Sequence, residues 1–268
     1  MDGIDHLCFN FSYLAVFLLE LAQLIWPKKG LRIATLVFAF AGLLAHTLFL
    51  AFKQPTPAMP YGSLLLLGWV FAIFYLYGSL HKGSRAWAVF FLPMVLILVW
   101  VAWFVFRDEN KGGTWFSGHH FWGMFHGGLL LAASVCIMFG FVTSSMYLIQ
   151  ARRLREKRNP LTGMKLLSLE TLERINRRSI NIAFPLLTIG LLLGIIRAEK
   201  AEAPETPWTA FKILGSFGLW VVATLLMIAR YRASLPARKL AWLTIAVFVL
   251  VIVTLFASHP FVASGGVQ

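Results

Sequence analysis

Long apolar runs separated by short polar segments dominate the chain. A helix needs about 20 apolar residues to cross a bilayer, and eight runs are long enough. They cover roughly residues 8–26, 33–52, 61–80, 86–106, 120–149, 180–197, 208–229 and 239–257. The pattern predicts an all-α integral membrane protein, a bundle of about eight transmembrane helices. Because the polar segments are short, residues 1–268 are predicted to form a single transmembrane domain.

Composition supports the membrane class. Of the 268 residues, 59% are hydrophobic and 13% are charged, whereas a soluble domain is about half apolar and a quarter charged. The formal net charge is +13, which on its own could indicate a nucleic-acid-binding protein. However, the basic residues gather between the apolar runs, as expected for loops beside anionic lipid headgroups. Membrane lipid is therefore the predicted partner, and no nucleic acid is expected.

Basic clusters follow the first, third, fifth and seventh runs. They comprise Lys28, Lys29, Arg32, Lys82, Arg85, Arg152, Arg153, Arg155, Lys157, Arg158, Arg230, Arg232, Arg238 and Lys239. The positive-inside rule then predicts both termini outside, in a multi-pass protein of the cell (inner or plasma) membrane. Within the long inner loop, LLSLETLERINRRSI (166–180) has leucines at helical spacing beneath a basic face. This segment is predicted to be one amphipathic helix on the inner face.

Six of the seven histidines fall in the outer half of this topology. His46 lies inside the second run, where an ionisable side chain is functional by default; a packing histidine bonded to a neighbouring helix is the alternative. His126 belongs to the stretch HHFWGMFHGG (119–128) at the start of the fifth run, and it could instead be an interfacial residue. His259 follows the eighth run and could equally be a tail residue.

The histidine pattern favours a large, flat cofactor over a small metal ion. HExxH and Cys/His zinc spacings are absent from the sequence. Haem iron accepts neutral imidazole axially, and a porphyrin binds in an apolar slot. We therefore predict haem as the cofactor, with His46 and His126 facing one slot as ligands of the iron and His259 as a further candidate. Trp122 and Phe125 would pack on the porphyrin, unless they belong to an ordinary interfacial aromatic belt.

Glu20 is the other polar group that the topology places inside the membrane. It lies in the first run with Gln23 nearby, and either a proton relay or a structural hydrogen bond between helices explains it. A small proton-coupled transporter using Glu20 and His46 is therefore an alternative function. No nucleophile–base set or phosphate-binding loop is evident in the sequence, so an enzyme is not expected.

Three segments resemble the CcsA/CcmC-type cytochrome c assembly proteins. They are HTLFLAFKQPTPAMPYGSLLLLGW (46–69), WGMFHGGLLLAASVCIMFGFVTSSMYLIQARRLREK (122–157) and LLSLETLERINRRSINIAFPLLTIGLLLG (166–194). The resemblance covers roughly residues 35–257 and implies haem handling near the outer membrane face, with other assembly proteins or apocytochrome c as partners. It also implies that His46 matches the family's intramembrane histidine and His126 its first outer-face histidine. His259 lies near the second.

The sequence departs from the family in one outer loop. Full members carry a tryptophan-rich WGxxWxWD motif before the seventh helix, whereas this chain has RAEKAEAPETPWTAFKILGSFGLW (197–220). Only Trp208 corresponds to the motif. The chain is therefore most similar to the HemX/YpjD-like branch, which implies an accessory or regulatory membrane protein without stable haem as an alternative to a haem-binding one.

Overall fold

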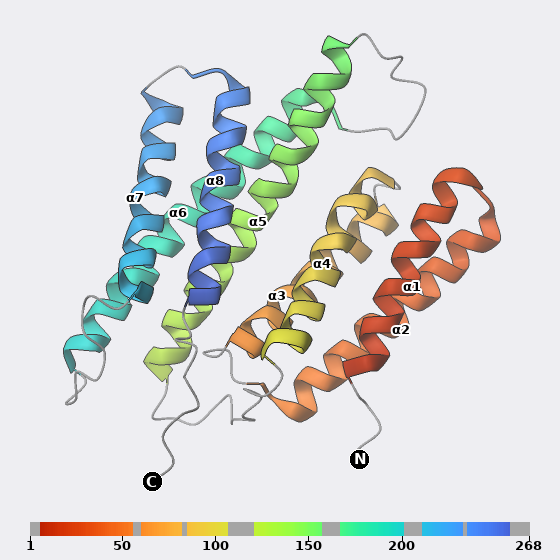
Figure 1. The fold of residues 1–268 in the computed structure, drawn as a ribbon, viewed down its shortest axis with the longest axis horizontal. Helices are drawn as coiled ribbons and strands as arrows, with labels where there is room; N and C mark the ends of the chain where they lie inside the picture. Colours follow the sequence, from red (N-terminus) through yellow and green to blue (C-terminus); the bar gives the residue numbers. More distant parts are fainter. Residues whose placement is uncertain are drawn as a thin grey trace. The chain divides into compact units, whose positions relative to one another are not determined.

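The described parts of the chain fold into long helices (Figure 1). This computed structural model describes residues 6–55, 60–81, 85–106, 121–156, 167–200, 211–232 and 235–257. They contain α1 (His6–Ile25), α2 (Lys29–Lys53), α3 (Pro60–His81), α4 (Arg85–Phe106), α5 (Phe121–Arg155), α6 (Leu169–Lys200), α7 (Phe211–Tyr231) and α8 (Ala237–Ala257). Within these ranges, 8 helices are long and apolar enough to cross a membrane. The predicted all-α multi-pass class is confirmed, and the orientation of the termini remains a prediction.

Seven of the helices lie close to their predicted runs, and α6 differs most. It begins at Leu169, so most of the predicted amphipathic segment continues directly into the sixth apolar run. The Ser168 hydroxyl accepts a hydrogen bond from the Thr171 N–H at 3.3 Å, which caps the helix start. Leu172, predicted to face the inner leaflet, is fully buried in the protein. The described part of this segment, 167–180, is therefore the start of a packed helix rather than a separate one.

The helices form two compact units, which are described separately. The first comprises Met1–His119 and Ile149–Thr171, and thus α1–α4 with the end of α5 and the first residues of α6. In it α1 packs on α2 and α4, α2 also packs on α3, and α3 packs on α4. Phe9, Phe71 and Phe91 are fully buried at its centre. A Cβ added at Gly42 would lie only 2.9 Å from the Ser12 Cβ, so a glycine allows α1 and α2 to approach closely.

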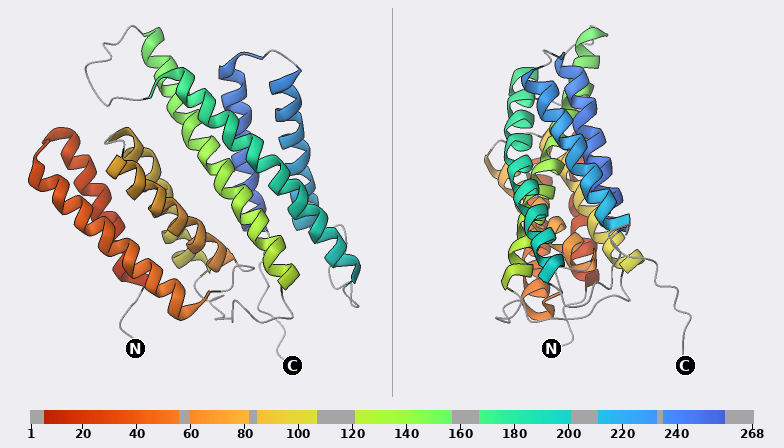
Figure 2. Two further views of the ribbon diagram at one scale, coloured as in Figure 1. Left: turned by 180° about the vertical axis from the view of Figure 1, so that it is seen from behind. Right: turned by 90° about the vertical axis from the view of Figure 1, so that its left-hand side faces the viewer.

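The second unit comprises His120–Leu148 and Leu172–Gln268. Here α7 packs on α8, and the two lie side by side in both ribbon figures (Figure 2). The rings of Phe141 in α5 and Phe248 in α8 stack with centroids 4.0 Å apart. The Trp220 indole N–H donates to the Thr188 hydroxyl at 3.0 Å, which ties α7 to α6. Aromatic stacking and polar contacts thus hold the four helices together.

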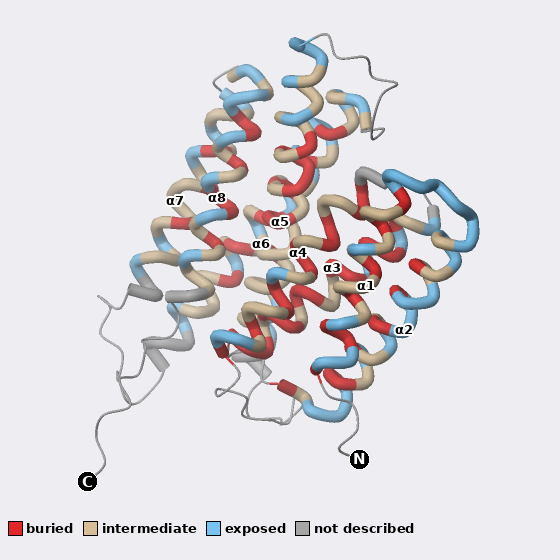
Figure 3. Tube along the Cα trace, turned by 45° about the vertical axis from the view of Figure 1, so that its right-hand side comes forward, coloured by how far each residue is buried: buried red, intermediate tan, exposed pale blue. Residues whose placement is uncertain are grey.

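Apolar side chains also cover much of the outer surface. Figure 3 shows exposed and buried stretches alternating along the helices. Phe104 is 71% exposed and Phe52 is 66% exposed. Large apolar groups in water would favour aggregation, whereas lipid tails solvate them at no cost. The surface therefore agrees with a multi-pass membrane protein.

Candidate functional site

His46 lies at the centre of the first unit. Its side chain has no exposed surface, and its ring stacks on Phe9 with centroids 4.3 Å apart and planes 5° from parallel. The Tyr13 hydroxyl is 3.2 Å from the His46 Nδ1. On the opposite helix, a Cβ added at Gly68 would lie 3.8 Å from the His46 Cε1. Side chains of α1 therefore position the ring, and Gly68 of α3 lies beside it.

The second ring nitrogen of His46 is unsatisfied. Its Nε2 atom is buried and has no hydrogen-bond partner in the described ranges. A buried polar atom without a partner is costly and often marks a functional position. Neutral imidazole ligates iron through one such nitrogen. The donor chemistry of His46 fits haem iron, although the surrounding side chains leave no open space beside the ring.

His126 lies in the second turn of α5 and is half-buried. Its Nδ1 is 2.6 Å from the backbone carbonyl of Gly190 in α6. A carbonyl can only accept, so Nδ1 carries the hydrogen and the lone pair of the neutral ring is on Nε2. Histidines that bind metals are usually oriented by such a bond from the other ring nitrogen.

Two glycines on α6 let α5 side chains approach closely, and Gly194 makes room for this imidazole. A Cβ added at Gly194 would lie 2.8 Å from the His126 Cε1, and one at Gly190 would lie 2.8 Å from the Leu130 Cδ2. The GxxxG spacing of these glycines is a known signal for close helix packing. The spacing does not indicate that a histidine lies against these glycines, so the contact of His126 with α6 was not predicted.

The remaining candidate residues are described only in part. Phe125, next to His126, is 48% exposed. Trp122 lies in the first turn of α5, and its side chain is outside the described structure. His259 is outside the described residues altogether. Their proposed contacts with a porphyrin therefore remain predictions.

The two principal histidines belong to different units. His46 is part of the first and His126 part of the second, so each is described by its own surroundings. The single slot shared by both histidines remains a prediction. Among the described residues, no group of three or more His, Cys, Asp or Glu side chains could hold a metal ion. Two axial imidazoles on haem do not require such a group.

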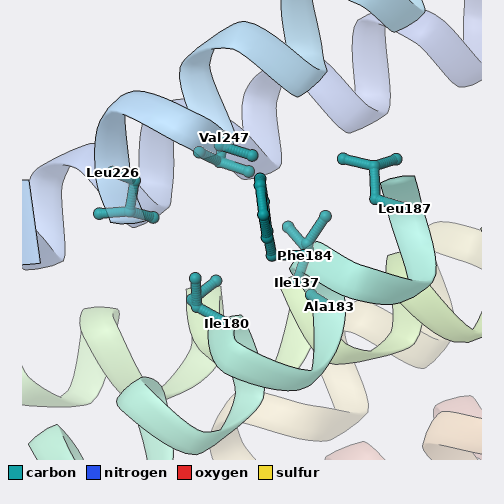
Figure 4. Close-up of a pocket in the computed structure, with 8 residues that line it drawn as sticks. Ile137, Ile180, Ala183, Phe184, Leu187, Leu226 and Val247 are labelled. Carbon is teal, nitrogen blue, oxygen red and sulfur yellow. The ribbon is translucent and has the colours of Figure 1, made fainter. Parts of the chain in front are cut away.

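An apolar crevice inside the second unit does not provide a haem site. It is lined by Ile137, Ile180, Ala183, Phe184, Leu187, Ala223, Leu226 and Val247 and encloses about 10 Å³. Figure 4 shows the Phe184 ring set among aliphatic side chains, and the lining residues come from α5, α6, α7 and α8. Ligand pockets usually measure about 300 Å³ or more, and the crevice offers no atom that binds iron. It is a packing defect of the core.

Glu20 takes part in a contact between helices of the first unit. The carboxyl is buried, and its Oε1 accepts a hydrogen bond of 2.9 Å from the Tyr75 hydroxyl of α3. Three residues further along α1, the Gln23 amide donates to the Thr35 hydroxyl at 2.6 Å. A structural hydrogen bond between helices, one of the two predicted roles of Glu20, is therefore present.

Comparison with known proteins gives one family. Residues 58–262 match the family model described as cytochrome c assembly protein. This range covers α3–α8 and includes Trp122, Phe125, His126 and His259. It begins after α2, so His46 lies outside it. No curated protein matches the chain.

Proposed function

The chain belongs to the cytochrome c assembly protein family, and on that premise we propose that it is a multi-pass membrane protein that binds haem through histidine side chains. Haem is then its cargo rather than a catalytic group. Its porphyrin would be buried among apolar side chains, which stabilises binding by roughly 25 cal/mol per Å² of apolar surface removed from water. Axial imidazoles would fix its position.

The geometry of His126 carries this proposal. The Gly190 carbonyl holds the Nδ1 hydrogen at 2.6 Å, so the neutral ring has its lone pair on Nε2, as iron requires. The residue is half-buried at the start of α5 and lies within the family match. Phe125 beside it is partly exposed and is proposed to pack on the porphyrin. Trp122 and His259 are proposed as further contacts.

His46 is proposed as the second histidine on different grounds. Its Nε2 has no hydrogen-bond partner among the described residues, and the Tyr13 hydroxyl holds the ring by Nδ1. However, the side chain is completely buried. Haem iron can reach this nitrogen only if side chains of α1–α4 move apart. His46 therefore has a nitrogen that suits haem iron, but haem can bind there only if the helices around it open locally.

The haem content of the purified full chain tests the proposal. A pyridine haemochrome spectrum gives moles of haem per mole of protein, compared at equal expression. We expect His126→Ala to lose most of the bound haem and His46→Ala a comparable part. His119→Ala and His120→Ala are matched histidine controls from the same stretch and should retain most of it. Wild-type haem in both His126→Ala and His46→Ala would refute the mechanism.

The same measurement separates the proposed function from its alternative. The chain is proposed to be closest to the HemX/YpjD-like branch, in which an accessory or regulatory protein binds a partner without stable haem. Wild-type protein that purifies without haem and does not take it up would favour that role. Where haem is bound, its affinity should fall at acid pH, because a protonated imidazole has no lone pair for iron.

A further inference from the structure

A cavity of about 190 Å³ lies between the four helices of the second unit, at the end that carries the basic residues. Its polar lining comes from three helices: Ser144 and Tyr147 of α5, Glu173, Asn176 and Arg177 of α6, and Arg230 and Tyr231 of α7. The N-terminal residue of α8, Ala237, also lines it. The haem proposal uses none of these residues.

Arg230 is held in place by a chain of hydrogen bonds. Its Nη2 donates to the Asn176 Oδ1 at 2.5 Å. Asn176 is buried, and its Nδ2 donates to the Gly140 carbonyl at 2.9 Å and to the Ser144 hydroxyl at 2.7 Å. Asn176, itself held by α5, thus fixes one side of the guanidinium. Its Nε is buried and has no hydrogen-bond partner in the described structure.

The cavity carries an excess of positive charge. Arg177 and Arg230 both line it, whereas Glu173 is its single acidic residue. Arg230 forms no ion pair with any described residue, and its polar contact is the neutral Asn176 amide. The start of α8 adds the partial positive charge of a helix N-terminus. The single Glu173 carboxylate offsets only one of the two guanidinium charges, so these features together favour a bound anion.

We propose that this cavity binds a phosphate group, supplied by the headgroup of an anionic phospholipid at the basic membrane face. Guanidinium matches phosphate in geometry as well as in charge, and basic pockets between membrane helices bind such headgroups. Leu235 and Leu240 line the same cavity and provide an apolar wall for the glycerol and the start of an acyl chain. At about 190 Å³ the cavity is smaller than pockets that hold whole cofactors.

A lipid titration of the detergent-purified full chain tests the site. Phosphatidylglycerol is added to the protein in neutral micelles, phosphatidylcholine serves as the neutral lipid, and inorganic phosphate is a third series. The thermal unfolding temperature is the readout. We expect stabilisation by phosphatidylglycerol alone, with a half-saturating concentration about tenfold higher in Arg230→Gln and in Arg177→Gln.

Arg178→Gln is the matched control. It removes the same charge from the neighbouring position of α6, which is exposed and does not line the cavity. If Arg230→Gln fails to fold because Asn176 loses its partner, Arg177→Gln decides the result. An unchanged titration in Arg177→Gln, or an equal loss in Arg178→Gln, would overturn the proposal. Equal stabilisation by inorganic phosphate, with the same dependence on Arg177, would overturn the lipid as the source.

Discussion

Three pairs of buried polar side chains join helices of the first unit. The pairs are His46 with Tyr13, Glu20 with Tyr75, and Gln23 with Thr35. Each pair has one member in α1, and the spacing of seven and then three residues places these members on one face of that helix. In a bilayer no water can satisfy such groups, so a partner on a neighbouring helix stabilises each of these pairs.

The two tyrosines of these pairs should differ in their effect on stability. Tyr13→Phe removes a hydrogen bond between neutral groups, which in membrane proteins averages about 0.6 kcal/mol. Tyr75→Phe leaves the buried Glu20 carboxyl without this donor and should cost more, about 1–3 kcal/mol. Unfolding of both variants in mixed micelles measures the difference. A larger loss in Tyr13→Phe than in Tyr75→Phe would show that the Glu20 contact is not structural.

The sequence predicted which histidines lie on which helices, but not what each one contacts. Hydropathy placed His46 inside a membrane span and His126 at the start of another. The contacts with Tyr13 and Gly190 depend on which helix packs beside which, and residue periodicity carries no such information. One indirect signal existed, because Tyr13 and Glu20 are seven residues apart and share a face of α1.

At the scale of helices, the contact of α5 with α6 controls the orientation of His126. Gly194→Ala would place a Cβ 2.8 Å from the His126 Cε1, so the imidazole must move. We expect this variant to lose a large part of its haem while remaining folded. Gly218→Ala is the matched control, because a Cβ there meets nothing within 4 Å. The readout is moles of haem per mole of protein. Equal haem in the two variants would show that the close contact with α6 does not position the His126 imidazole.

Helix ends were less predictable than helix number. Hydropathy marks where lipid begins, whereas caps and turns determine where a helix begins and ends. The α2 helix ends at Lys53 because Gln54 adopts a left-handed conformation, with φ of 41°, immediately before Pro55. For α6, a capping serine at 168 starts the helix well before the lipid-facing part, and no glycine or proline interrupts 169–184. The predicted amphipathic segment is therefore continuous with the membrane-spanning part of α6.

At the scale of the whole molecule, the family match leaves out two helices that pack into the first unit. The match covers α3–α8, yet α1 supplies Phe9, Tyr13 and Val16 to the core of the first unit, each almost completely buried. Removing α1 would expose the His46 ring and part of the α4 surface. The first two helices are therefore part of the fold of this unit, and the proposed role of His46 depends on them.

The orientation in the membrane is the prediction on which the placement of the histidines depends. The α5 helix has 35 residues, about 52 Å at 1.5 Å per residue, so its basic end extends beyond a hydrocarbon core of about 30 Å. Arg152, Arg153 and Arg155 at that end should stay inside.

Reporter fusions at Arg155 and after Gln268 should therefore report opposite sides, because three further helices follow α5. Replacing Arg152, Arg153 and Arg155 with Gln should disturb this topology more than it lowers haem content, since basic residues near anionic headgroups are worth about 1 kcal/mol each. Normal topology with lost haem would assign these arginines to the haem site instead. If both fusions reported the same side, the predicted topology would be wrong. His126 would then not be placed at the outer face, and haem would have to reach it from another side.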